Sequence, residues 1–432
     1  MNNEINLVQL SLIKKSKKYL IDCKKKGLEI GLSPFCDLTT WINSLGYQKL
    51  QLINKNKFFS KSYLRYFFSE ILNIGRFNFD YYVYDNICNK KKLNIIYSYS
   101  WKKNFKKDIF FDDYFKVNSN NKNFFFILNS VDGFLPKKAK NCVIITRTKI
   151  FFNPFTFLSH FFNKIFCKDF FHKFNSTNIF NEFIQKIVQN ELPKKKINVL
   201  IPYENRPHQN AFIIATNNKN YENKVICYLH NMPWPFQLDM IYKKIKINKL
   251  FVCSNIQKKM LVKNYSWPKN IVKTTSSLRF KELQNRERTI FLPFDLTEDH
   301  DDLLQGFKVL TSKVFFDLSN YKISIHPLKI FAKDHINFKK EILEILKKSK
   351  KTKSKIKNTD PIIFSHPGGT ATECLQVCNS AYHITADKLH VFSRKIWNSI
   401  KISKIDKNVY KYVSKNTKFL ILDKKNSIKN FI

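Results

Sequence analysis

Residues 197–211, INVLIPYENRPHQNA, and residues 361–378, PIIFSHPGGTATECLQVC, share one order of segments. Each begins with a short apolar run, continues through a polar loop and ends in a run with helical character. The apolar runs, 197–201 and 361–365, have the length and composition of buried strands. A strand that leads through a short loop into a helix is the repeating unit of parallel α/β sheets. The two stretches therefore predict two βα series in one chain.

Other short β-rich runs fit the same pattern. Further strands are expected at 93–99, 124–128, 143–146, 225–229, 249–253, 289–294, 321–325, 380–384 and 419–422. Helices are expected to separate them, among them an amphipathic helix at 172–192, and helical spacing also covers 1–30 and parts of 36–75. The fold class predicted is α/β, with two Rossmann-like domains that face a central cleft. Residues 1–90 would be a helical or mixed part of the first domain, 91–270 its Rossmann-like sheet, and 271–432 the second domain.

The composition is strongly basic. The 432 residues carry a formal net charge of +43 and include 42 Phe but only 8 Gly. Enrichment in Lys, Asn, Ile and Phe is typical of an AT-rich genome, which accounts for much of the charge. The remaining excess would attract phosphorylated donors or anionic lipid headgroups. Basic residues are spread along the chain without a recognisable DNA or RNA module, so a nucleic-acid partner is not expected.

The cysteines indicate a reducing compartment. There are nine, an odd number, with irregular spacing and no CxxC pair. Neither a disulfide framework nor a zinc site fits that pattern.

The sequence contains no membrane-spanning run. No signal-peptide core and no stretch of 18 apolar residues is present, so we expect a cytoplasmic protein. Residues 151–171, FFNPFTFLSHFFNKIFCKDFF, are aromatic but interrupted by polar residues. They are either a connecting segment with a buried face or a surface that contacts the inner membrane or a lipid-linked acceptor.

Three polar clusters follow predicted strands. Glu204 follows the strand at 197–201, His230 follows the strand at 225–229, and His326-Pro327-Leu328-Lys329 follows the strand at 321–325. Ligands of open parallel sheets bind at the carboxyl ends of strands. A carboxylate there can accept a proton, and a histidine or lysine can bind phosphate. The alternatives are a dipole-favoured acid at a helix start, a structural loop histidine and a strand-terminating His-Pro pair.

The turn at 368–373 is the strongest binding candidate. Gly368 and Gly369 allow close backbone approach, and Thr370 and Thr372 lie at a predicted helix start where N–H and hydroxyl groups can hold phosphate oxygens. Glu373 could accept hydrogen bonds from ribose hydroxyls. The alternative is a plain helix N-cap. The spacing matches neither GxxxxGK[ST] nor GxGxxG.

Several chemistries lack their motifs. No DxD motif stands in a plausible context, because EDHDD at 298–302 reads as a capping cluster at a helix start. No Ser-His-Asp or GxSxG arrangement is found. We therefore expect neither a metal nor another cofactor.

The order PYENRPHQNA, YLHNMPWP, SWP…SLRF, SIHP and SHPGGTATE resembles surface-carbohydrate biosynthesis proteins related to bacterial sialyltransferase-like and capsule-type glycosyltransferases. The resemblance covers about residues 195–390. It implies the two-Rossmann GT-B architecture and metal-independent, inverting transfer from a nucleotide-sugar donor, for example a CMP-linked one. The acceptor would be a surface polysaccharide, such as capsule or lipopolysaccharide, or a glycolipid.

The resemblance also implies roles for individual residues. The first domain would hold the acceptor, with Glu204 as general base, and the second would hold the donor. His326 would act on the nucleotide phosphate. Pro327, Thr370, Thr372 and Glu373 would contact the donor on the same grounds. His230, Arg279, Lys329, Gly368 and Gly369 are further candidate donor contacts. The chain departs from the pattern of that family in Glu204-Asn205-Arg206, where some members carry two acids and a glycine, and in Gly-Gly-Thr-Ala-Thr, which stands in place of a Ser-Ser or Ser-Thr pair.

Three other functions stay open at this point. One is a polyol-phosphate transferase that uses a CDP-linked alcohol on the same fold. Another is a non-enzymatic, basic nucleic-acid-binding protein. The third is an inactive relative, because Glu204 is the only acid in its segment.

Overall fold

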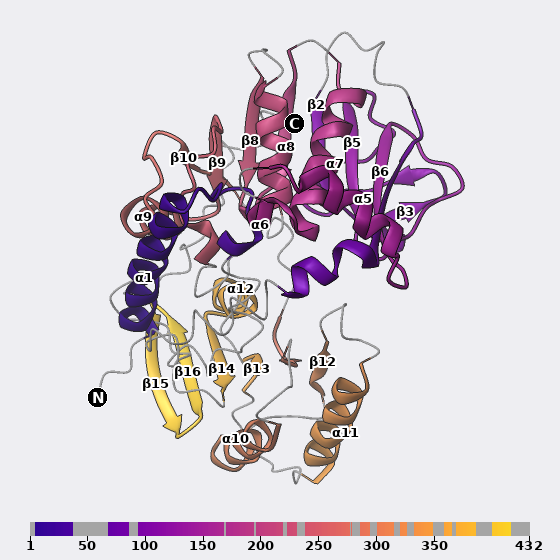
Figure 1. Cartoon of the computed structure of the whole chain (residues 1–432). Coiled ribbons are helices and arrows are strands. Elements are labelled where there is room, and N and C mark those ends of the chain that lie inside the picture. The colour runs from indigo at the N-terminus through magenta and orange to yellow at the C-terminus, as the bar shows by residue number, and fades with distance from the viewer. Residues whose placement is uncertain are drawn as a thin grey trace.

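The computed structural model describes residues 5–37, 68–85, 94–167, 170–193, 196–218, 223–230, 238–276, 278, 286–293, 300–314, 320–325, 332–348, 358–364, 369–385 and 400–415. Two α/β parts make up the described chain, one with an eight-stranded sheet and one with a six-stranded sheet (Figure 1). Most neighbouring strands in both sheets are parallel. The predicted α/β class with two Rossmann-like sheets is confirmed.

The first part contains α1 and the strands up to β10. Its elements are α1 (Ile5–Lys25), η1 (Pro34–Cys36), η3 (Ile74–Arg76), β1 (Phe77–Val83), β2 (Asn94–Ser100), η4 (Lys102–Asn104), β3 (Phe105–Lys106), β4 (Ile109–Phe110), β5 (Phe124–Ser130), β6 (Cys142–Lys149), α5 (Pro154–Lys164), α6 (Phe170–Lys173), α7 (Ser176–Glu191), β7 (Asn198–Pro202), α8 (Pro207–Asn218), β8 (Lys224–Tyr228), η5 (Leu238–Met240), β9 (Lys249–Val252), α9 (Asn255–Asn264) and β10 (Val272–Thr274).

The first sheet has the strand order β1-β6-β5-β2-β7-β8-β9-β10. Only β1 runs antiparallel to its neighbour, β6. In the register of the central strands, Ile95 of β2 lies opposite Phe125 of β5 and Val199 of β7. Strands of a parallel sheet that is covered on both faces read as continuous apolar runs, and almost every residue of β5 is buried.

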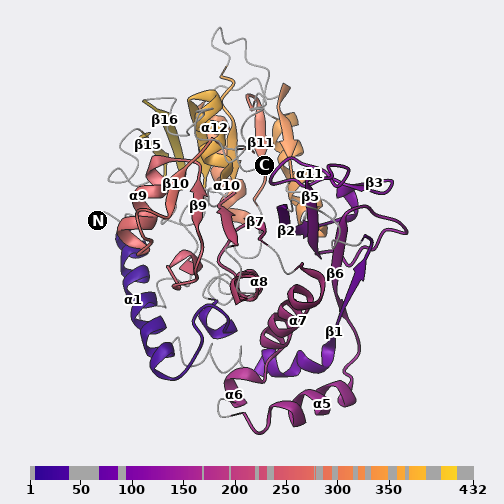
Figure 2. The same ribbon diagram turned by 90° about the horizontal axis from the view of Figure 1, so that it is seen from above.

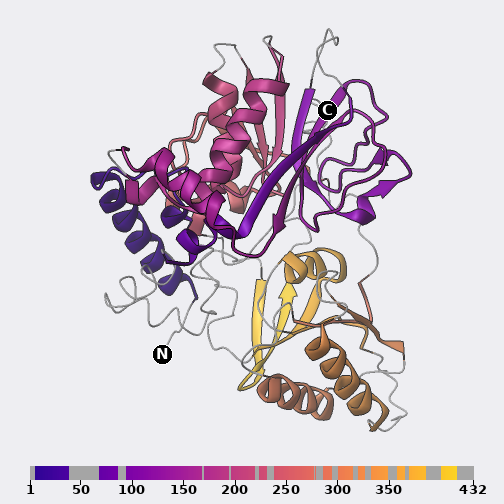
Figure 3. The ribbon, with the colours of Figure 1, turned by 45° about the vertical axis from the view of Figure 1, so that its right-hand side comes forward.

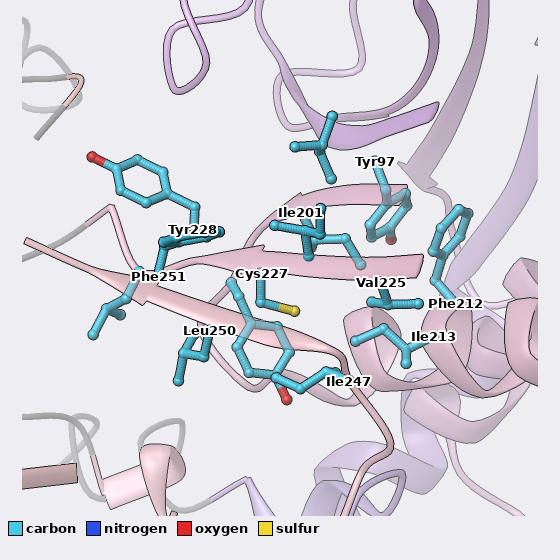
Figure 4. Close-up of a cluster of buried hydrophobic side chains, with 14 of the residues drawn as sticks. Tyr97, Ile201, Phe212, Ile213, Val225, Cys227, Tyr228, Ile247, Leu250 and Phe251 are labelled. Atoms are coloured by element: carbon cyan, nitrogen blue, oxygen red, sulfur yellow. The ribbon is translucent and has the colours of Figure 1, made fainter. Parts of the chain in front are cut away.

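Aromatic contacts join the covering elements to this sheet. Helices α7 and α8 cover one face, where the rings of Tyr97 on β2 and Phe212 on α8 stack with centroids 4.4 Å apart (Figure 4). The short β3–β4 hairpin covers the other face, with Phe110 5.4 Å from Phe126 of β5 between ring centroids. Stacked and edge-to-face pairs of this kind add to the burial of apolar surface.

The second part begins at β11. Its elements are β11 (Thr289–Phe291), α10 (His300–Lys313), β12 (Lys322–Ser324), α11 (Lys333–Lys348), β13 (Ile362–Phe364), α12 (Gly369–Cys378), β14 (Ser380–Ile384), β15 (Ile400–Asp406) and β16 (Val409–Ser414). The strand order is β12-β11-β13-β14-β16-β15, and β15 and β16 form an antiparallel hairpin at one edge. Asp301 and Asp302 lie in the first turn of α10, as expected for a capping cluster.

The two faces of the second sheet have different neighbours. Phe307 of α10 and Phe338 of α11 pack with Phe364 of β13 on one face. On the other face, side chains of α12 belong to the same buried apolar cluster as the core of the first part. Helix α12 accordingly lies between the two parts (Figures 1 and 3).

The sequence located most elements but missed others. The strands predicted at 93–99, 124–128, 143–146, 197–201, 225–229, 249–253, 289–294, 321–325, 361–365 and 380–384 are present with shifted ends, as are the helices at 1–30 and 172–192. The strand expected at 419–422 lies outside the described residues. Strands β1, β10, β15 and β16 were not predicted. The last strand of the first sheet ends at Thr274, and the first strand of the second sheet begins at Thr289. Strands β1 and β10 lie outside the range 91–270 but belong to the first sheet. The domain limits at 90 and 270 stay a prediction.

One expectation about connections is wrong. Helices were expected between the strands at 93–99, 124–128 and 143–146. The chain instead crosses from β2 to β5 through η4 and the β3–β4 hairpin, and from β5 to β6 through a loop. Residues 101–123 and 131–141 are rich in Asn, Lys and Asp and lack helical apolar spacing, so they satisfy their backbone groups through turns such as the one that Asp112 makes with Tyr114 and Phe115.

The aromatic segment at 151–171 forms α5 and α6 at the edge of the first part (Figure 2). No side chain of α5 is fully buried, but Phe157 and Phe161 are half-buried on one side of the helix, where they pack against Phe174. Among the described residues, no helix has the length and apolarity needed to cross a membrane. The described cysteines are all free thiols.

Candidate functional site

Among the described parallel strands, each sheet has one point at which the order of strand addition reverses. In the first sheet, β5 and β6 are added on one side of β2, whereas β7, β8, β9 and β10 are added on the other. In the second, β12 is added on one side of β11, whereas β13 and β14 are added on the other. Ligands of open α/β sheets bind outside the carboxyl ends of the strands at such points. Ligand sites are therefore expected at the carboxyl ends of β2 and β7 and at those of β11 and β13.

The loop after β7 carries Glu204 in a fixed position. The side-chain oxygen of Gln209, in the first turn of α8, accepts hydrogen bonds from the backbone N–H of Glu204 at 2.9 Å and of Arg206 at 3.3 Å. Its amide nitrogen donates to the carbonyl of Pro202 at 2.7 Å and to the hydroxyl of Tyr99 at 3.2 Å. Gln209 thus ties the end of β7 to the end of β2 across the first switch point.

Asn205 gives this loop its shape. Its backbone has φ of 59°, in the left-handed region that Asn tolerates better than most residues. The side-chain nitrogen donates to the carbonyls of Asp239 at 2.5 Å and Ile241 at 3.0 Å, and the side-chain oxygen accepts from Tyr203 Oη at 2.8 Å and Asn210 Nδ2 at 3.1 Å. These hydrogen bonds stabilise the turn that carries Glu204.

The structure brings Glu204 and His230 together. Glu204 Oε1 lies 3.6 Å from Nε2 of His230, which follows β8 and is buried. The Tyr114 ring meets the imidazole edge-on with centroids 4.4 Å apart. A half-buried carboxylate beside an imidazole at the strand ends can accept a proton from a hydroxyl group or orient the imidazole to do so.

A buried network of charged side chains lies beside Glu204 and His230. Arg206 NH1 lies 2.8 Å from Asp37 Oδ1 and 3.6 Å from Asp239 Oδ2, and its Nε lies 3.7 Å from Glu204 Oε2. Lys243 Nζ lies 3.7 Å from Asp239 Oδ1 and donates to the Asn205 carbonyl at 3.1 Å. Charges at such depth require partners. The network therefore fixes the loop electrostatically as well as through neutral hydrogen bonds.

Burial and charge shift the titration of this cluster in definite directions. Burial, together with the nearby Asp37 carboxylate, raises the pKa of Asp239 to about 7. Burial disfavours the charge of Arg206, but the carboxylates of Asp37, Asp239 and Glu204 outweigh it and raise the pKa of the guanidinium. Burial and Arg206 lower the pKa of His208 to about 4, so its imidazole is neutral at pH 7 beside the Tyr99 hydroxyl.

The second cluster begins α12, directly after the second switch point. Gly369 is the first residue of the helix, Thr370 is half-buried and Thr372 is 1% exposed. Glu373 Oε1 accepts from Arg286 Nε at 2.8 Å and from Arg286 NH2 at 2.5 Å. Of the two threonines predicted at a phosphate, Thr370 is partly exposed and Thr372 is buried.

The remaining predicted site residues cannot be placed. His326, Arg279, Pro327, Lys329 and Gly368 lie outside the described residues, so their roles stay predictions. Within the described ranges, no group of three or more His, Cys, Asp or Glu side chains could hold a metal ion. Independence from metals also stays a prediction.

Sequence reasoning missed several residues of the first cluster. Arg206 and Gln209 stood within the quoted motif, but nothing in the sequence showed their partners. Asp37 and Asp239 are 169 and 33 positions away from Arg206 in the chain, so only the fold brings them together. Arg286 also lies far in sequence from Glu373. The one local signal was Asp239 and Lys243 at a spacing of four residues.

Fold and site together define a two-part α/β protein with a polar cluster at each switch point. No protein-family model matches the sequence, and no curated protein matches it. Among solved structures, the chain is similar to a glycosyltransferase from Rickettsia africae ESF-5, with 14% identity and a TM-score of 0.32, over 70% of this chain and 81% of that one.

Two trehalose-phosphate synthases are also similar. One is the trehalose-6-phosphate synthase OtsA, with 11% identity and a TM-score of 0.29, over 58% of this chain and 74% of that one. The other is a UDP-forming alpha,alpha-trehalose-phosphate synthase from Burkholderia xenovorans in complex with glucose-6-phosphate, with 8% identity and a TM-score of 0.30, over 65% of this chain and 82% of that one. Similarity at this level transfers no activity, so the chemistry must come from this chain's own residues.

Proposed function

We propose that this chain is a glycosyltransferase that moves a sugar from a nucleotide-sugar donor to a hydroxyl group of a glycan or lipid-linked acceptor. The observation that carries the proposal is that both polar clusters lie at switch points. Glu204 and His230 follow β7 and β8 beside the first, and Gly369 and Thr370 follow β13 at the second. One protein would then have two ligand sites, as a transfer between two substrates requires.

The donor would bind at the start of α12. Backbone N–H groups at a helix N-terminus favour phosphate oxygens, and Gly369 leaves the backbone accessible. Thr370 would supply a hydroxyl group, while Thr372 would shape the turn from its buried position. Arg286 contacts only Oε1 of Glu373, so Oε2 would accept hydrogen bonds from ribose. His326, Pro327, Lys329, Arg279 and Gly368 would complete the donor site.

The acceptor would bind beside Glu204. As an acceptor hydroxyl attacks the anomeric carbon, its proton would pass to Glu204 and the bond to the leaving phosphate would break. The electron pair would go to that phosphate, which the α12 N-terminus and His326 would stabilise in place of a metal ion. A single displacement of this kind inverts the anomeric carbon. His230, 3.6 Å from Glu204, would orient the carboxylate.

A panel of nucleotides tests the donor site. The full chain would be melted in the presence of CMP, CDP, UDP and GDP, because a ligand that binds only the native state raises the melting temperature. We expect one nucleotide to stabilise the chain selectively. A melting temperature unchanged by every nucleotide would overturn the proposal, and stabilisation by CDP with turnover of a CDP-linked alcohol would identify the polyol-phosphate transferase instead.

Replacement of the proposed base tests the chemistry. Glu204→Gln should reduce release of nucleotide from the matching nucleotide-sugar by about 100-fold or more, the usual contribution of a general base. The nucleotide-induced rise in melting temperature should persist. Glu344→Gln, at an exposed position of α11, is the matched control and should leave both readouts unchanged. Full turnover by Glu204→Gln would show that Glu204 is not the base.

A further inference from the structure

Helix α5 and its flanks expose an unusual amount of aromatic surface. Phe151, Phe155 and Phe166 are 99%, 82% and 96% exposed. Leu158, Phe162 and Ile165 are exposed as well. Scattered exposed apolar residues need no explanation, but a contiguous group marks an interaction surface.

The exposed side chains of α5 share one side of the helix. Residues 155, 158, 162 and 165 are spaced by three, four and three positions, which places them along one face. We call Phe155, Leu158, Phe162 and Ile165 the α5 face. The opposite side packs inward, where the rings of Phe157 and Phe161 lie 5.2 and 5.7 Å from Phe174 between centroids. A helix that is apolar on both sides needs a second apolar environment.

The α5 face is held in place rather than loosely tethered. Asn153 caps the helix, since its side-chain oxygen accepts from the N–H of Phe155 and Thr156 at 3.0 and 3.2 Å. The N–H of Asn153 donates to the Gly75 carbonyl at 2.7 Å. Gly75 permits this close contact, because a Cβ there would approach the Phe152 ring to 2.6 Å and the Asn153 carbonyl oxygen to 3.0 Å. The helix is therefore presented in a fixed orientation.

Charge distinguishes among the occupants of this surface. Residues 151–167 contain no acidic residue, and exposed Lys149 and Lys173 lie on either side of that stretch. A second copy of this chain would bring together two molecules of formal charge +43, which repel each other. An anionic phospholipid surface would attract the same charge while its acyl region accepts the aromatic rings.

We infer that the α5 face, with Phe151 and Phe166, docks onto an anionic phospholipid bilayer, with α5 lying in the plane of the interface. Helix α5 lies at the rim of the first part, and none of the described elements lies outside it in Figure 2. Docking depends on this surface alone and does not require transferase activity. If the chain is a transferase, docking would bring it to acceptors carried by lipids.

Vesicle sedimentation tests the inference. The full chain would be mixed with phosphatidylcholine vesicles that contain or lack phosphatidylglycerol. We expect binding to the anionic vesicles, and a decrease of at least about tenfold for the triple variant Phe155→Ser/Phe162→Ser/Phe166→Ser, because three aromatic rings would no longer enter the acyl region. These side chains are exposed, so the melting temperature should stay that of the wild type.

A matched control uses exposed apolar residues of the second part. Ile336→Ser/Leu343→Ser on α11 removes exposed apolar side chains from a different surface and should leave vesicle binding unchanged. Equal binding by the triple variant and the wild type would overturn the inference, as would a wild type that ignores anionic vesicles. A concentration-dependent dimer that the triple variant abolishes, without any vesicle binding, would identify the α5 face as a contact between copies.

Discussion

Removal of the Arg206 charge should destabilise the first part far more than removal of an exposed charge. The Arg206 side chain is 20% exposed, and its partners Asp37 and Asp239 are 11% and 0% exposed. The 2.8 Å contact with Asp37 corresponds to about 6 kcal/mol of attraction at an effective dielectric constant of about 20. Desolvation cancels much of that attraction while the network is intact. Arg206→Met keeps the aliphatic stem but removes the cation beside Asp37 and leaves Asp239 with Lys243 alone, which should cost about 3–5 kcal/mol.

Urea unfolding at neutral pH measures this loss in the free energy of unfolding. Tryptophan fluorescence suits the assay, since buried Trp267 donates a hydrogen bond to Met240, next to Asp239. Lys140→Met is the control. Lys140 lies 2.9 Å from Asp108 at the surface, with side-chain exposures of 51% and 32%, and an ion pair this exposed contributes little to stability.

The pH dependence of the loss provides a second check. In Arg206→Met, the native pKa of Asp239 should exceed the wild-type value of about 7, whereas an unfolded Asp has the ordinary value of 3.8. The variant's native state therefore binds more protons than its unfolded state, and its stability should fall as pH rises. The deficit relative to wild type should shrink at low pH. A deficit no larger than that of Lys140→Met, at every pH, would refute the reasoning about a buried network.

Two further variants test the supporting structure. Asn205→Ala should lower the free energy of unfolding in urea by about 3 kcal/mol, because it removes four hydrogen bonds and places alanine in a left-handed backbone conformation. Asn205→Gly should lower it less, because glycine accepts that φ. An equal loss in the two variants would contradict the role of backbone strain. Burial raises the pKa of Asp112 from 3.8 to about 6. Between these two pH values the native state keeps a proton that the unfolded state has lost. The stability of the wild type relative to Asp112→Asn should therefore fall by up to about 3 kcal/mol between pH 4 and 7 in paired urea titrations, and a constant difference would place the Asp112 pKa near its ordinary value.

Local patterns carried most of the fold prediction. The apolar run at 197–201 and the helix at 369–378 are encoded within a few residues, so strand, loop and helix could be recognised separately. Crossovers were less predictable, because the expectation of helices between strands comes from typical folds and not from residues 101–123 themselves. The β15–β16 hairpin depends on pairing with β14 and left too weak a local signal.

The site was predictable only in part, for the same reason. Glu204 and His230 could be named because each follows a strand, and strand ends meet at one edge of a parallel sheet. Their separation of 3.6 Å and the surrounding charges depend on strand order. Asp37 comes from a segment before the sheet begins, and only the packed structure brings it to Arg206.

The position of α12 limits how the two sheets can move. Ala371, Cys374 and Leu375 on this helix share a continuous apolar interior with the first sheet, as does Tyr412 on β16. A wide hinge opening would expose these side chains to water, at about 25 cal/mol for each Å² uncovered. Small sliding displacements keep them covered, as in shear-type motions of packed layers. Substrate entry would then depend on loop rearrangement above fixed sheets more than on separation of the two halves.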